Sequence, residues 1–249
     1  MLIGMRNAML AGGGGQPSGG YWGLCFTAEE AGATVAMKKS GTPPEVSLLY
    51  STDAANWSPF VVGTTTVTLA SIGDKVWLKA NSGGNARFGS STSNYNTFSL
   101  SGQIAASGNI MSLLDGETES YTISVESNYC FFMLFSGCSS LTTAPELPAT
   151  TIAARGYLRM FQNCTSLKVA PFLPATTVAN QQYIQMFDGC SSLENVNVAL
   201  TAWGSTSNWL RNVAATGTLY CPTALGTNET INRGNNYCPT GWTVVNTDA

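Results

Sequence analysis

Residues 138–164 read CSSLTTAPELPATTIAARGYLRMFQNC, and residues 164–190 read CTSLKVAPFLPATTVANQQYIQMFDGC. Both segments begin and end with cysteine, and both contain the motif P-x-L-P-A-T-T. Cys138, Cys164 and Cys190 are therefore 26 residues apart, twice. A period of about 20–29 residues is typical of leucine-rich solenoids, whose units stack because no single unit can bury its own apolar face. The sequence thus predicts a short stack of coils.

Apolar positions keep the same register around each cysteine. An aromatic residue stands seven positions before it, leucine or methionine four before, phenylalanine three before, and leucine three after. These positions are Phe131, Tyr157 and Tyr183; Leu134, Met160 and Met186; Phe135, Phe161 and Phe187; Leu141, Leu167 and Leu193.

Each repeat suggests an extended segment followed by a helix. The stretch after the cysteine is expected to be extended with its leucine inward, and the prolines are expected to turn the chain. The spacing of Tyr157, Phe161 and Cys164 matches one face of a helix, which we expect to begin at residues 149–151. Stacking would place the cysteines in a buried column of small apolar groups.

The pattern C-x-S-L-x-x-A-P-x-L-P-A-T-T, followed by an aromatic residue and M-F-x-x-C, resembles the BspA-like leucine-rich repeats. In this family such repeats occur in surface and adhesion proteins of Bacteroides-type bacteria and in related phage or prophage genes. The resemblance covers about residues 112–245, and its C-terminal part is similar to the cap of such arrays. In the third unit Asn197 and Leu200 replace the two prolines, so the array is expected to end near Trp203.

Residues 21–111 lack the 26-residue period and alternate short apolar runs with turn residues. The segments 46–62 and 65–80 each predict two strands around a turn, and 96–107 adds another. Five to eight short strands in a segment of this length predict a small antiparallel sandwich or jelly roll.

The expected fold is therefore mainly β with short helices: an N-terminal antiparallel β-sandwich followed by a short α/β leucine-rich-repeat solenoid with a C-terminal cap. We divide the chain into a docking peptide with a glycine-rich linker (1–20), the β-sandwich (21–111), the repeats (112–217) and the cap (218–249).

Composition excludes several classes of function. The sequence has no histidine, which rules out Ser-His-Asp and Cys-His catalysis. Charged residues make up 10% and the net charge is −3, so nothing indicates nucleic-acid binding. No apolar run reaches the roughly 20 residues that span a bilayer. The seven cysteines form no C-x-x-C pair, and no motif singles out two of the 14 acids. We expect no enzyme, no catalytic residue, no metal and no cofactor.

Two sets of residues are candidates for contact with partners. Apolar residues before the linker form a candidate docking peptide, and Arg6 lies within them rather than before them, unlike in a secretory signal. This peptide comprises Leu2, Ile3, Met5, Met9 and Leu10. Positions that are free to differ between repeats are candidates for a ligand surface, namely Glu146, Phe172, Lys168, Arg155 and Arg159.

Three hypotheses follow for function. The first is a non-enzymatic subunit of a phage virion appendage, exposed on the particle. It would dock on a capsid or tail protein through the N-terminal peptide and present the repeats to a host-surface glycan or protein, as a homo-oligomer such as a trimer. The second is a bacterial cell-surface adhesin of the same repeat family. The third is a decoration that binds nothing.

Overall fold

The computed structural model describes residues 23–116 and 124–248, and within them the chain is mainly β. The described residues contain one helix, α1 (Ser112–Asp115). The strands are β1 (Cys25–Ala28), β2 (Ala33–Ser40), β3 (Leu48–Ser51), β4 (Ser58–Phe60), β5 (Thr66–Leu69), β6 (Lys75–Ala80), β7 (Tyr95–Ser101), β8 (Ile104–Ser107), β9 (Ser124–Val125), β10 (Leu141–Thr143), β11 (Thr151–Ile152), β12 (Asn195–Asn197), β13 (Gly217–Cys221) and β14 (Trp242–Asn246).

The first eight strands form two antiparallel walls. One sheet has the order β8-β1-β6-β3-β4, with β10 added in parallel to β8, and the other has the order β5-β2-β7. The segments 46–62 and 65–80 each contain the two strands predicted for them. The segment 96–107, predicted to add one strand, contains two, β7 and β8, which belong to different sheets. Phe26 of β1 meets Phe98 of β7 across the core, with ring centroids 5.1 Å apart.

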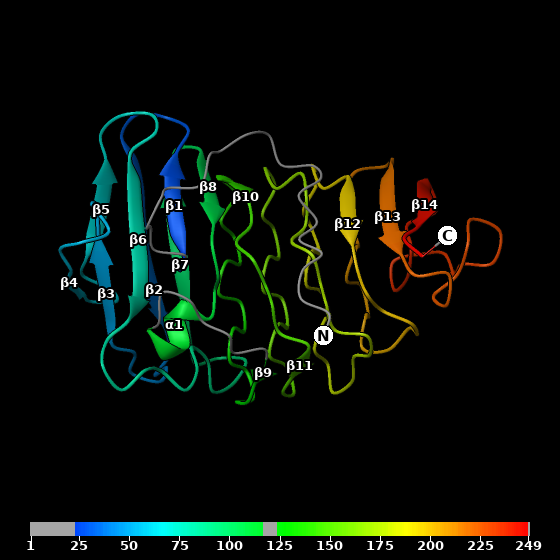
Figure 1. Ribbon diagram of the computed structural model, residues 1–249, viewed down its shortest axis with the longest axis horizontal. Helices are drawn as coiled ribbons and strands as arrows, with labels where there is room; N and C mark the ends of the chain where they lie inside the picture. Colours follow the sequence, from blue (N-terminus) through cyan, green and yellow to red (C-terminus); the bar gives the residue numbers. More distant parts are fainter. Residues whose placement is uncertain (1–22, 117–123, 249) are drawn as a thin grey trace, which may run out of the picture.

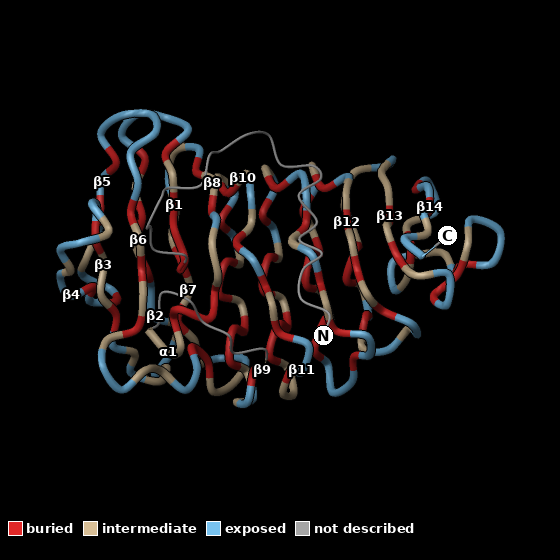
Figure 2. Tube along the Cα trace, viewed as in Figure 1, coloured by how far each residue is buried: buried red, intermediate tan, exposed pale blue. Residues whose placement is uncertain are grey.

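The repeats extend both walls in one direction (Figure 1). On one wall, isolated parallel bridges link Thr143 to Val169 and Val169 to Asn195, and β12, β13 and β14 continue the parallel ladder. On the other wall, the Phe98 N–H donates to the Leu134 carbonyl at 2.7 Å. Buried residues recur along each leg of the coil and form one core (Figure 2). The parallel ladder continues beyond Trp203 through β13 and β14, which lie at the end of the predicted repeats and in the region assigned to the cap.

The second wall of the repeats is a ribbon of successive turns, so the expected short helices, and with them the α/β description, are wrong. Alternate N–H groups leave the coil: those of Phe131, Met133 and Phe135 donate to the next coil at 2.9–3.1 Å. The N–H groups between them bond three residues back within their own coil. A helix would use every interior N–H within itself, whereas stacking needs half of them for the neighbouring coil.

This ribbon has a period of four residues. In the middle coil, residues with left-handed φ recur at Arg155, Arg159 and Asn163, with φ of 61°, 56° and 61°. The position of Asn163 is occupied by Gly137 and Gly189 in the neighbouring coils, residue types that adopt this conformation most readily. At Thr151, where the helix was expected to begin, the chain instead forms β11, which pairs with β9.

The three repeat cysteines form the predicted column. Each thiol donates to a phenylalanine carbonyl of the preceding coil: Cys138 to Phe98 at 3.3 Å, Cys164 to Phe135 at 3.1 Å and Cys190 to Phe161 at 3.0 Å. All seven cysteines of the chain are free and buried. Burial raises the pKa of the Cys138 thiol to about 12, so it remains protonated and able to donate at neutral pH. These cysteines therefore connect coils.

Two aromatic ladders run through the core. Phe98, Phe135, Phe161 and Phe187 stack with centroids 5.0, 5.2 and 5.5 Å apart. Phe88, Phe131, Tyr157 and Tyr183 stack at 6.0, 6.0 and 6.3 Å. Each ladder begins in the antiparallel region and ends in the repeats, so one packed column of rings joins the two parts of the chain.

The C-terminal edge of the parallel sheet is closed by side chains. The Asn228 amide accepts from the Val244 N–H at 2.8 Å and donates to the Val244 carbonyl at 3.0 Å, as a neighbouring strand would. The Arg233 guanidinium donates to the Trp242 carbonyl at 2.6 Å. Because β14 is the last strand of the ladder, these contacts occupy backbone groups that another chain could otherwise pair with.

We expect Asn228→Ala to cause self-association. The substitution removes both part-buried bonds to Val244, each of which contributes about 0.5–1.5 kcal/mol, and opens the β14 edge. Light scattering after gel filtration should show larger species than wild type at equal concentration. Asn232→Ala, an exposed position in the same loop, is the control. Identical elution of Asn228→Ala and wild type would contradict this role for Asn228.

Candidate binding surface

The outer face of the parallel ladder carries two rows of side chains, which we call the platform. Strand register and the repeat spacing align one residue per coil in each row, and every residue of both rows is exposed or half-buried. The first row contains Thr143, Val169, Asn195, Thr218 and Thr243, and the second contains Glu146, Phe172, Asn197, Tyr220 and Val245.

Large apolar side chains are exposed on the platform. Phe172 is 52% exposed, Val169 50% and Val245 42%. Elsewhere among the described residues only Val61 and Ile72 are large, apolar and exposed. In the second row the inward neighbours Leu173, Val198 and Leu219 are fully packed in the core, so the row lies on a rigid backbone. The platform is thus a preformed surface that combines apolar groups with amides and hydroxyls.

The structure brings together three of the five candidate ligand residues. Glu146 and Phe172 occupy matched positions of the second row, and Lys168 lies exposed beside Val169. The repeat spacing did not identify Tyr220 and Val245, which fall in the region assigned to the cap. Alternation along β13 and β14, where Leu219 and Val244 point inward, could have identified them.

Arg155 and Arg159 lie on the ribbon, across the core from the platform. The Arg155 Nε donates to Gln181 Oε1 at 2.6 Å, and the guanidinium lies over the Tyr129 ring, 5.1 Å from its centroid. The Arg159 Nε donates to Gln185 Oε1 at 2.8 Å. Both arginines therefore bond to the next coil, and the structure does not bring them together with Phe172.

Asp188 is a buried acid of the ribbon whose carboxylate accepts several hydrogen bonds. Its carboxylate accepts from Arg211 at 2.6 and 2.9 Å and from Gln162 at 3.2 Å. Burial of the carboxyl would raise its pKa, but the hydrogen bonds from Arg211 and Gln162 and the Arg211 charge outweigh that effect and lower it.

We expect the Asp188 carboxylate to make stability depend on pH in the acidic range. A lowered pKa in the folded state means that its contribution is complete above the unfolded pKa, about 3.9, and is lost as the pH falls through the folded value. Urea unfolding should show wild type more stable than Asp188→Asn by a constant margin from about pH 7 to 5, and by less below about pH 4. A margin independent of pH down to about pH 2 would contradict this.

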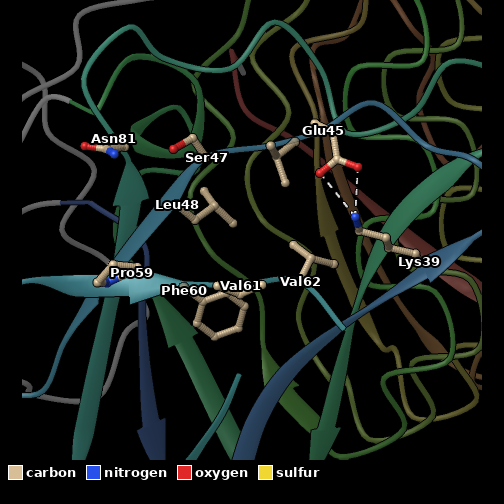
Figure 3. A pocket seen from close by; sticks show the side chains of 10 residues that line it. Lys39, Glu45, Ser47, Leu48, Pro59, Phe60, Val61, Val62 and Asn81 are labelled. Atoms are coloured by element: carbon tan, nitrogen blue, oxygen red, sulfur yellow. Dashed lines mark hydrogen bonds and ion pairs between the residues drawn. The ribbon is translucent and has the colours of Figure 1, made fainter. Parts of the chain in front are cut away.

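A hollow lies at the end of the molecule that contains β3 and β4, away from β13 and β14 (Figure 1), and Figure 3 shows the side chains that line it. Its walls come from the end of β2, the start of β3 with the segment before it, and β4 with the segment after it. A Lys39–Glu45 ion pair of 2.9 Å crosses one side. Its volume is about 160 Å³, below the roughly 300 Å³ at which ligand pockets begin. Among the described residues, the platform is therefore the stronger candidate for a binding site.

Other expected features are not placed by the structure. The candidate docking residues Leu2, Ile3, Met5, Met9 and Leu10 lie outside the described residues. Within residues 23–116 and 124–248, no group of three or more acidic or cysteine side chains is arranged to hold a metal ion. In the same part of the chain, no helix has the length and apolar character needed to cross a bilayer.

Comparisons with protein-family models, curated proteins and solved structures gave no match.

Proposed function

We propose that this chain is a non-enzymatic structural and binding protein, a subunit of a phage virion appendage that anchors through its N-terminal peptide and presents the platform to a host cell. The platform carries the proposal, because exposed apolar side chains on a rigid, preformed surface are typical of recognition sites. Several copies on one particle would strengthen weak contacts through effective concentration.

The finer description of the fold belongs to the same proposal. We assign the two antiparallel walls within residues 23–111 to a small β-sandwich, on the basis of the inward contact between Phe26 of β1 and Phe98 of β7. We assign the coils to the BspA-like leucine-rich repeats, on the basis of the repeated motif and the cysteine column. In both regions a rigid core holds the surface side chains in place, which favours a binding role over a catalytic one.

Adsorption to host cells tests the proposed function. Fluorescent full-length protein is incubated with a panel of gut bacteria, and the double variant Val169→Glu, Phe172→Glu is compared with Ile72→Glu. We expect the double variant to lose adsorption, because it places charges on the platform, and Ile72→Glu to retain it. Absence of adsorption to every strain, or equal adsorption by all three proteins, would overturn the proposal.

Particle assembly tests the anchor. Deletion of residues 1–15 is expected to abolish incorporation into particles while leaving the folded part intact by circular dichroism. Unchanged incorporation would remove the docking role of residues 1–11. Recovery of the full chain from the bacterial envelope with a processed N-terminus, rather than from particles, would favour the adhesin hypothesis.

A further inference from the structure

We infer that the platform binds an uncharged, extended glycan chain that lies along the solenoid axis, with sugar rings stacked on Phe172 and Tyr220. This inference rests on the proposed function and names the ligand class of the same surface. It is carried by the order of side chains along the second row, by the polarity of the first row and by the charges around both.

The second row places two aromatic side chains two coils apart. Phe172, Asn197 and Tyr220 lie on three consecutive coils, because Leu173 bridges to Val198 and Asn197 pairs with Tyr220. Neighbouring strands are about 4.8 Å apart, so the two aromatic positions are separated by roughly 10 Å. This distance is about two sugar rings of an extended chain, which would place alternate rings over the two aromatic side chains. The apolar C–H face of a sugar ring packs on an aromatic face, with its hydroxyls free at the rim.

The positions beside the rings supply matching polar groups. Asn197 stands between the aromatic residues, and Asn195 and Thr218 stand beside them in the first row. A carboxamide both donates and accepts, and a hydroxyl does the same, so these side chains suit a ligand rich in hydroxyl groups. Asn195, Asn197 and Thr218 thus offer such groups on the two coils that follow Phe172.

Charge distinguishes this ligand from the alternatives. The Glu146 carboxylate lies within the second row and Glu194 adjoins the first, so a polyanion would meet like charge at both places. Lys168 lies beside Val169, and Arg233 at the β14 edge already donates to the Trp242 carbonyl. A protein partner would require a larger continuous apolar centre, whereas Val169 and Phe172 form a pair on one coil, and the coils with Asn197 and Thr218 lie between this pair and Val245.

Chemical treatment of cells separates a glycan receptor from a protein receptor. Bacteria that adsorb the full-length protein are treated with periodate, which cleaves vicinal diols of sugars, or with a broad-specificity protease. We expect periodate to abolish adsorption and protease to leave it unchanged. Loss after protease alone would overturn the glycan inference and leave the proposed function standing, whereas absence of any adsorption would remove both.

Competition and ring variants complete the test. Polysaccharide extracted from the adsorbing cells is divided by anion exchange into uncharged and anionic fractions, and each competes with adsorption of the full-length protein. We expect competition by the uncharged fraction only. Phe172→Val and Tyr220→Val should each weaken half-saturation at least about tenfold, whereas Ile72→Val should bind as wild type. Thermal unfolding checks that each variant is folded. Competition by the anionic fraction alone, or full binding by folded Phe172→Val and Tyr220→Val, would overturn the inference.

Discussion

Phe135→Ala is expected to lower the free energy of unfolding by about 3–5 kcal/mol, a large part of the stability of a protein of this size. The Phe135 ring is fully buried and touches three others: Phe98 at 5.0 Å, Phe161 at 5.2 Å and Phe26 at 6.3 Å. Its removal leaves a cavity at the point where the antiparallel walls meet the coils. Chemical denaturation followed by tryptophan fluorescence measures the loss.

Phe172→Ala is the matched control, because it deletes the same atoms from a side chain that is 52% exposed. Its cost should be well under half that of Phe135→Ala. Because the aromatic ladder is continuous, we also expect the antiparallel region and the coils to unfold in one transition in wild type. Equal costs for the two variants, or two separate wild-type transitions, would contradict a shared core.

The column of cysteines illustrates what the sequence alone could establish. A period of 26 residues places identical side chains over one another whatever the path of the chain between them, so Cys138, Cys164 and Cys190 had to align once stacking occurred. The leucines and phenylalanines in register with them are buried as predicted. Spacing alone could not show that each thiol donates to a carbonyl of the preceding coil.

The ribbon shows why the helix prediction was wrong. Burial at positions i, i+3, i+4 and i+7 fits a helix of 3.6 residues per turn, and it fits a turn ribbon with a period of four equally well. The two differ in where the N–H groups bond, and that depends on the neighbouring coil rather than on local sequence. The left-handed positions gave little warning, because Arg155, Arg159 and Gln185 occupy them where glycine or asparagine would be expected.

The platform was predicted only where the repeat is regular. Comparison of matched positions identified Glu146 and Phe172. The coils from Asn195 to Thr218 and from Thr218 to Thr243 are shorter than 26 residues, so no fixed offset connects Phe172 to Tyr220 or Val245. Arg155 and Arg159 also differ from the residues at matched positions of the next repeat, but such a difference does not reveal which wall a residue occupies.

Removal of one whole coil is expected to leave a folded protein. Deletion of residues 139–164 joins Cys138 directly to Thr165, so the ribbon 129–137 faces the ribbon 181–189 and β8 faces the leg that contains Val169. Both new interfaces repeat those already present: Phe135 would stack on Phe187, and the Cys190 thiol would reach the Phe135 carbonyl in place of that of Phe161. The deletion also removes Arg155 and Arg159, so no like charges meet across the new interface. We expect cooperative thermal unfolding at a lower midpoint, because a stack loses one unit and one interface.

Deletion of residues 139–151 is the contrasting variant, because it removes half a coil. It takes away β10 and its leucine, Leu141, and joins one ribbon almost directly to the next, so the coil cannot close around the core. The aromatic residue seven positions before each remaining cysteine is kept, and the amino-acid composition changes little. The two deletions therefore differ in whether the remaining coils can stack. We expect this variant to be insoluble or to lack a cooperative transition by circular dichroism. Cooperative folding of both variants, or of neither, would show that the 26-residue coil is not the unit from which this protein is built.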